Sequence, residues 1–260
     1  MDFKALLDHH IPDHTLLPLF SAGPVQFSLT KHLVVMWAVG AFLLGVLTYA
    51  ARSRSQFGLL LRTGVEAVVL YLRDTVFEPI LGHGGMRYMH YLLSLFFFIL
   101  LCNLAGLIPG SATATGNISV TAALAICTFC LIVIAGIRAQ GFIPFLKHFA
   151  PVPPGLPAWI SPVLYVILPV IEVLGLFVKC FALTIRLFAN MIAGHIVALG
   201  FMSLIFIFGA TSTLVGLTVA PFSVLLVVFV YLIELLVAVL QAFIFTLLTT
   251  VFVGSVLHAH

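Results

Sequence analysis

Charged side chains are scarce in this chain. Lysine, arginine, aspartate and glutamate make up only 7% of its 260 residues, while 63% of the residues are hydrophobic. A water-soluble domain needs many more charges on its surface, so that class of protein is excluded. Apolar runs long enough to cross a bilayer recur along the sequence. The composition therefore predicts a polytopic membrane protein.

Other kinds of chemistry also lack their usual residues. The net charge is only +3 and the basic residues are scattered, which gives no footprint for nucleic acid. All four cysteines fall in apolar segments, so a disulfide framework is not expected. Cys127-x-x-Cys130 fits thiols packed in a helix better than a metal or redox pair. The absence of a His-Glu-x-x-His motif argues against an intramembrane metalloprotease.

The N-terminal region has neither the basic-then-apolar order of a secretory signal nor the arginine- and serine-rich composition of a transit peptide. We therefore expect a bacterial inner-membrane protein, with the mitochondrial inner membrane as the alternative location. His9, His10 and His14 are able to bind a metal, but a solvated polar end explains them better. We predict no metal site and no cofactor.

The apolar segments predict an all-α fold with five membrane-embedded helices, over residues 33–51, 89–108, 118–137, 163–207 and 219–257. Residues 57–81 mix charged side chains with leucine and valine, which is typical of an amphipathic helix on the membrane surface. We expect a single integral membrane domain over residues 1–260. Its parts are an outer N-terminal region (1–32), three spans with the surface helix (33–137), an inner loop (138–162) and a helical hairpin (163–260).

The basic residues predict how the chain crosses the membrane. With the N-terminus outside, five spans leave only Lys4 and Lys31 on the outer side. The inner side then holds seven basic residues: Arg52, Arg54, Arg62, Arg73, Arg87, Arg138 and Lys147. This excess satisfies the positive-inside rule and places the C-terminus inside.

The last two segments are too long to stand upright in a bilayer. About 40 helical residues extend roughly 60 Å, whereas the hydrocarbon core is about 30 Å thick. We therefore expect a steeply tilted or bent hairpin, with its tip near residues 209–216. Pro169 can bend the first helix, and Pro221 suits the first turn of the second.

Arg186 is the most unusual residue, because it lies deep inside an apolar segment. A charged guanidinium costs roughly 2.5 kcal/mol or more at the centre of a membrane helix. It keeps its proton at physiological pH, so it cannot become neutral. Something must stabilise this charge.

The side of the helix around Arg186 is lined by small residues. At about 100° per residue, several positions fall within roughly 60° of it. They are Glu172, Gly175, Lys179, Ala182, Ala189, Asn190 and Ala193. His195 falls on the opposite side. Small residues let another backbone come close, so this face predicts a partner that brings a carboxylate to Arg186.

The final segment carries Glu234 and Gln241, which share one helix face because they are seven residues apart. Counted from the tip, Arg186 and Gln241 lie at similar depths, His195 and Glu234 lie on the outer side, and Glu172 lies on the inner side. Histidine and glutamate exchange protons, but arginine does not. This order predicts two proton-accessible sets separated by a fixed positive charge, with a mobile carboxylate on another subunit.

At these residues the sequence resembles the a subunit of the F-type (rotary) ATP synthase. Arg186-Leu-Phe-Ala-Asn190-Met-Ile-Ala-Gly194-His195 is similar to the arginine motif of that family, and Leu240-Gln241-Ala-Phe-Ile-Phe-Thr is similar to its C-terminal motif. The likeness extends to Asn103-Leu-Ala-Gly-Leu-Ile-Pro109 and covers nearly the whole chain.

The resemblance implies a stator subunit that conducts protons through two offset half-channels. Arg186 would face the rotating ring of c subunits, with Asn190 and Gln241 shaping its setting. Glu172 would line the inner half-channel, and His195 and Glu234 the outer one. The implied partners are the c-ring, the peripheral-stalk b subunits and the rest of the F1Fo complex.

The order of His195 and Glu234 departs from the enteric bacterial pattern, in which the carboxylate comes first, and agrees with mitochondrial forms. We interpret the exchange as keeping an interacting acid–imidazole pair. A secondary ion-coupled transporter is the alternative function, but the internal repeats and paired broken helices of such proteins are not seen. Whether protons or sodium ions are carried stays open, with protons as the default.

Overall fold

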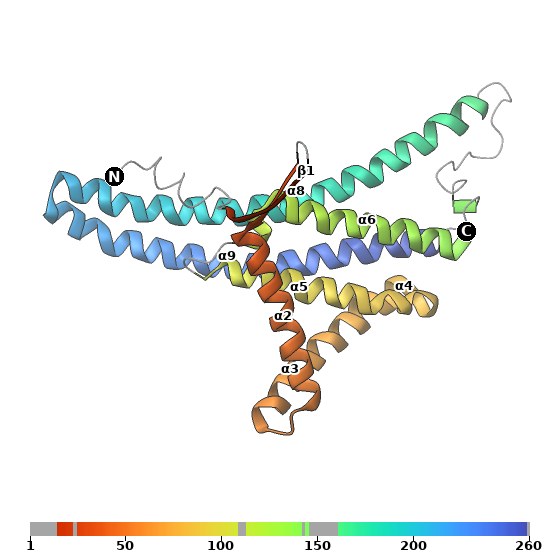
Figure 1. Cartoon of the computed structure of the whole chain (residues 1–260), viewed down its shortest axis with the longest axis horizontal. Coiled ribbons are helices and arrows are strands. Elements are labelled where there is room, and N and C mark those ends of the chain that lie inside the picture. The colour runs from red at the N-terminus through yellow and green to blue at the C-terminus, as the bar shows by residue number, and fades with distance from the viewer. Residues whose placement is uncertain (1–14, 23–24, 109–112, 142–143, 146–160, 259–260) are drawn as a thin grey trace. The chain divides into compact units, whose positions relative to one another are not determined.

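The structure, a computed structural model, describes residues 15–22, 25–108, 113–141, 144–145 and 161–258 (Figure 1). Most of them are helical. The α-helices are α2 (Lys31–Arg52), α3 (Gln56–Leu72), α4 (Glu78–Gly85), α5 (Met89–Gly106), α6 (Ile118–Gln140), α8 (Ser161–Thr211) and α9 (Thr213–Leu257). The structure also contains a π-helical turn (Arg73–Phe77) and two 3-10 turns (Met86–Tyr88 and Ala114–Gly116).

Helices long and apolar enough to span a membrane occur five times in the described chain. They cover Lys31–Arg52, Met86–Gly106, Ile118–Gln140, Ile167–Thr211 and Thr213–Leu257. Each overlaps one of the five predicted spans. The prediction of an all-α polytopic membrane protein is therefore confirmed.

A short hairpin precedes the first span and was not predicted. Strand β1 (Thr15–Ala22) pairs antiparallel with strand β2 (Val25–Thr30). In β2, Val25, Phe27 and Leu29 alternate with polar residues, which is the period of a strand. Pro18 lies within β1. Proline is tolerated there because both strands of a two-stranded sheet are edge strands.

The predicted surface helix 57–81 consists of separate helical pieces. Helix α3 begins after Ser55, whose side chain accepts a 3.1 Å hydrogen bond from the Gly58 backbone nitrogen and so caps the helix. The π-helical turn follows α3, and α4 contains Gly82 at φ +60, a left-handed conformation that interrupts the helix. Its position on the membrane surface stays a prediction.

The hairpin tip lies where the sequence placed it. Helix α8 ends at Thr211 and α9 begins at Thr213, so Ser212 alone separates them. A Cβ on Gly216 would lie 2.6 Å from the Gly209 Cα, so this close approach requires glycine. The expectation for Pro221 was wrong, because α9 begins eight residues before it and Pro221 lies inside the helix. Membrane helices tolerate such a proline when other groups satisfy the freed carbonyl.

The chain forms two compact units, which we describe separately. The first contains residues 1–48, 97–120 and 186–242, and the second contains residues 49–96, 121–185 and 243–260. In the second unit the end of α9 packs closely against α4 and α6. Gln140 Nε2 donates a 2.6 Å hydrogen bond to the Val256 carbonyl, and a Cβ on Gly254 would lie 2.8 Å from Ile80. The first unit contains Arg186, His195, Glu234 and Gln241. The predicted single domain and its outer and inner sides stay predictions.

Candidate functional site

Residues on α8 (Ser161–Thr211) differ in their exposure. Ala182, Arg186, Ala189, Asn190 and Ala193 are exposed. Leucine, methionine and small residues elsewhere on the helix are buried: Cys180, Leu183, Thr184, Leu187, Met191 and Ala198. The small-residue face around Arg186 is therefore open to a partner.

Arg186 has no hydrogen bond or ion pair with any residue that the structure describes. By contrast, the Lys179 ammonium lies over the Phe252 ring, 5.4 Å from its centroid. Gly175 has open space around it, since a Cβ there would meet no atom within 4 Å. Glu172 lies on α8, but its side chain is outside the described part. Arg186 is thus a cation without a carboxylate among the described residues.

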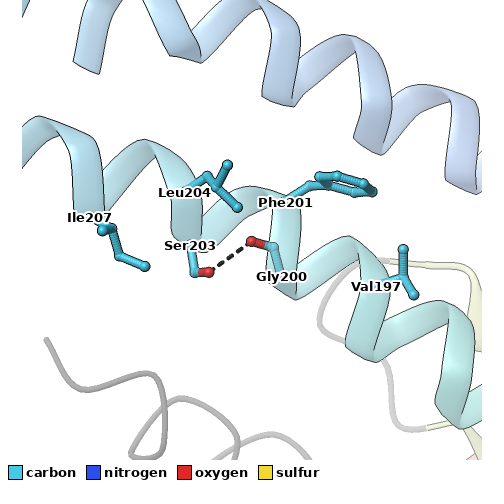
Figure 2. A pocket seen from close by; sticks show the side chains of 6 residues that line it. All are labelled: Val197, Gly200, Phe201, Ser203, Leu204 and Ile207. Carbon is cyan, nitrogen blue, oxygen red and sulfur yellow. Dashed lines mark hydrogen bonds between the residues drawn. The ribbon is translucent and has the colours of Figure 1, made fainter. Parts of the chain in front are cut away.

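A hollow on α8 nearer the tip continues the exposed face of Arg186. At about 100° per residue, Val197, Gly200 and Leu204 fall within roughly 40° of Arg186. Figure 2 shows this pocket, with Phe201, Ser203 and Ile207 completing its lining. The Ser203 hydroxyl donates a 2.7 Å hydrogen bond to the Gly200 carbonyl. The lining contains no ionisable side chain, so this pocket supplies no group that exchanges protons.

Asn190 and Gln241 join the two long helices by a hydrogen bond. Asn190 Nδ2 donates to Gln241 Oε1 over 3.2 Å, and Gln241 is 2% exposed. The sequence predicted that Gln241 and Arg186 lie at similar depths. In the structure, the partner of Gln241 is Asn190, which lies one helical turn after Arg186. Gln241 Nε2 is buried and unpaired within the described chain, so both N–H donors of the amide are unused there.

Glu234 is buried on α9 against Gly194 of α8. The residue is 7% exposed, and neither carboxylate oxygen has a hydrogen-bond partner among the described residues. A Cβ on Gly194 would overlap Glu234 Oε1 and would lie 2.5 Å from its Cδ and 2.7 Å from its Cγ. Buried polar groups without partners are uncommon, and an unpaired carboxylate needs an explanation more than a hydroxyl does because of its possible charge. Gly194 therefore provides the space that the Glu234 carboxylate occupies.

If the chain conducts protons, as the resemblance implies, we expect Gly194→Ala to lower proton conduction about tenfold, because overpacking by one methyl group typically costs about 1–3 kcal/mol and here displaces the Glu234 carboxylate. The measurement is passive proton flux through membrane vesicles that contain the assembled complex. Gly45→Ala in α2 is the matched control, since a Cβ there also meets nothing within 4 Å. Equal flux in the two variants would show that the Glu234 position does not matter.

His195 is hydrogen-bonded to a residue that sequence reasoning missed. Its Nε2 lies 2.6 Å from Thr113 Oγ1, in the turn before α6. No hydrogen bond or ion pair joins His195 directly to Glu234 within the described part of the chain. The expected acid–imidazole pair is therefore not hydrogen-bonded, although Glu234 lies against Gly194, the residue next to His195. Nothing in an uncharged turn singled out Thr113 before its contact with His195 was known.

Asn103 is a further polar residue near the site. The sequence analysis named it in the family resemblance but did not predict it as a site residue. It is fully buried on α5, and its Nδ2 donates a 3.2 Å hydrogen bond to the Ala238 carbonyl of α9. Ala238 lies between Glu234 and Gln241 on the same helix. The signal was available, because a buried amide inside an apolar span needs a partner.

Metal binding finds no support in the described residues, which contain no group of three or more histidine, cysteine, aspartate or glutamate side chains able to hold an ion. His9, His10 and His14 lie outside the described residues.

The site thus consists of an exposed cation on one side of α8 and buried polar side chains on the other. Ionisable groups inside the spans of a polytopic helical protein mark a functional site, and ion pathways and proton relays are among the functions that use them.

Comparison with known proteins defines the family. Residues 33–254 match the ATP synthase A chain family. The chain is 44% identical over 243 residues to ATP synthase subunit a of Chloroherpeton thalassium, covering 92% of this chain and 69% of that protein. It is 42% identical over 243 residues to ATP synthase subunit a of Myxococcus xanthus, covering 92% and 76%. It is also 44% identical over 261 residues to ATP synthase subunit a 2 of Prosthecochloris aestuarii, covering 98% and 74%. The chain therefore belongs to the ATP synthase A chain family.

Proposed function

We propose that this chain is the stator subunit a of a rotary F-type ATP synthase. In this role it conducts protons to and from a carboxylate on each subunit of a c-ring, and so couples proton flow to rotation and ATP synthesis. Its own part is proton translocation rather than catalysis. The relatives named ATP synthase subunit a support its association with the rest of an F1Fo complex in a bacterial membrane. The peripheral-stalk b subunits and the surrounding lipid are its further partners in the inner membrane.

Arg186 is the observation that carries this proposal. It is exposed on the small-residue face of α8 and has no anionic partner among the described residues. A permanent cation in an apolar span requires a counter-charge, and here a ring carboxylate supplies it. Because the guanidinium does not release its proton, it bars direct passage between the two sides. Protons then have to travel on the ring.

The polar residues divide into two half-channels around this barrier. His195 and Glu234 form the outer one, where the buried Glu234 carboxylate rests on Gly194. Glu172 lines the inner one. Asn190 and Gln241, hydrogen-bonded to each other, lie beside Arg186 and shape the site where the ring carboxylate exchanges its proton.

The exposed face of α8 gives a direct test of the ring contact. We expect single cysteines at Ala189 and Ala193 to form disulfides with cysteines placed in the outer helix of the c subunit. A cysteine at Met191 is the matched control, because Met191 is 3% exposed and lies between them on the buried side. The measurement is the yield of cross-linked a–c product after oxidation. The native cysteines are replaced first, since Cys180 lies on the same helix.

Equal cross-linking at residues 189 and 191 would show that the phasing of α8 is wrong. The same experiment distinguishes the proposed function from the alternative, a secondary ion-coupled transporter. A transporter that works alone has no c subunit to capture, so a complete absence of a–c product in all three variants would favour it.

A further inference from the structure

Thr113 lies in the short turn before α6, and the structure engages both of its oxygen atoms. Its carbonyl accepts a 2.9 Å hydrogen bond from the Gly116 backbone nitrogen and a 2.8 Å hydrogen bond from His32 Nδ1. Its hydroxyl lies 2.6 Å from His195 Nε2. Thr113 is only 6% exposed. A hydroxyl on an otherwise ordinary turn is therefore held in one place from several directions.

The end of α5 fixes Thr113 further. A Cβ on Gly106 would lie 2.5 Å from Thr113 Cγ2 and 2.9 Å from its Oγ1. Gly106 therefore has to lack a side chain for Thr113 to sit where it does. Because the side chain is confined on this side, its hydroxyl has little freedom to turn away from His195.

The first span contributes through His32, which lies at the start of α2. A carbonyl oxygen only accepts hydrogen bonds, so His32 Nδ1 carries the proton in its contact with Thr113. His32, Thr113 and His195 thus form a continuous polar link from the first span, through the turn, to α8. All three belong to the same compact unit of the chain.

A hydroxyl is suited to hold a histidine that gains and loses protons. A neutral imidazole nitrogen without hydrogen accepts a hydrogen bond, whereas the same nitrogen donates once it is protonated. A carbonyl oxygen in place of the hydroxyl could only accept a hydrogen bond from the protonated nitrogen. An amide N–H could only donate one to the unprotonated nitrogen. The threonine hydroxyl rotates to meet both. The contact therefore survives either protonation state of Nε2.

We propose that Thr113 is a positioning residue for His195, and that His32 holds Thr113 in place. This inference rests on the proposed function of His195 in the outer half-channel. Thr113 keeps the imidazole in one orientation through Nε2 and leaves Nδ1 to exchange protons with the path. The outer half-channel thereby includes the start of α2 and the turn before α6, in addition to the hairpin.

The first test removes the hydroxyl in the assembled complex. We expect Thr113→Val to lower passive proton flux through membrane vesicles about tenfold, as expected for the loss of one hydrogen bond to a reacting group. Thr113→Ser keeps the hydroxyl and should restore at least half of the flux. Thr113→Ala is made as a second variant without the hydroxyl, so that the result does not depend on how valine fits against Gly106.

Thr115→Val is the matched control for damage to the turn. Thr115 lies two residues further on, is fully buried, and its hydroxyl has no partner among the described residues. It should keep near-normal flux. If Thr113→Val and Thr113→Ala conduct like Thr115→Val, the inference is overturned.

The second test observes the NMR signals of His195 directly and does not depend on proton flux. In solid-state NMR spectra of the complex with isotope-labelled histidine, His195→Gln identifies the His195 signals by their loss. We expect the Nε2 signal to move in Thr113→Val and to stay in place in Thr113→Ser. An unchanged signal in Thr113→Val would contradict the inference.

Failure of this inference is distinguishable from failure of the proposed function. Arg186→Ala is measured in the same vesicles as a reference. If proton-driven synthesis is normal in Arg186→Ala, the proposed function is wrong. If synthesis is lost there while Thr113→Val behaves as wild type in flux and NMR, only the role of Thr113 is wrong.

Discussion

Arg186→Ala is expected to assemble into the complex and to make no ATP from a proton gradient. Assembly should survive because Arg186 is exposed and makes no contact that other described residues need. Synthesis should stop because, under the proposed function, the variant lacks the fixed cation that bars direct proton passage. The measurement is ATP formation in energised membrane vesicles, together with the amount of complex in the membrane.

Two further variants sharpen this result. Arg186→Lys should also fail, since an ammonium lacks the planar five-donor fork of arginine and is able to lose its proton in an apolar setting. Arg54→Ala is the control for removing a cation, because Arg54 is exposed in the turn between α2 and α3. Normal synthesis in well-assembled Arg186→Ala complexes would contradict the barrier role.

Glu234→Gln is expected to lower proton flux about a hundredfold, the effect of removing one positioned acid–base group. Glutamine has nearly the same shape, so it fits the space beside Gly194 that the carboxylate occupies. It has no proton to exchange, and the outer half-channel would lose its buried acid. The measurement is passive proton flux at a fixed membrane potential.

Thr246→Val is the matched control on the same helix. Thr246 is 1% exposed and its hydroxyl is also buried without a partner among the described residues. This change removes a buried polar group that we place outside the proton path, so flux should stay near normal. If Glu234→Gln conducted as well as Thr246→Val, Glu234 would be a structural residue.

Hydropathy and helical phasing predicted much of the fold. The five spans follow from the length of apolar runs, because a helix in a bilayer has to satisfy its own backbone. The grouping of Arg186 with Ala182, Ala189 and Ala193 on one side of a helix follows from the helical period, and all four residues are exposed. These are local properties, which a single sequence contains.

Contacts between distant segments could not be predicted in this way. Thr113 and His195 are 82 positions apart, and no pattern in either segment specifies that they meet. The contact of Glu234 with Gly194 likewise depends on how α8 and α9 face each other. The strand alternation in β2 was present in the sequence, but the prolines around it obscured the signal.

The join between α8 and α9 has a mechanical consequence. One residue, Ser212, connects the helices, and Gly216 touches the backbone of Gly209 just beyond it. Because no loop separates the two helices, a sideways load on the end of α8 passes directly to α9. This end of the hairpin therefore behaves as one rigid unit. A turning rotor pressing on α8 would be resisted by both helices together.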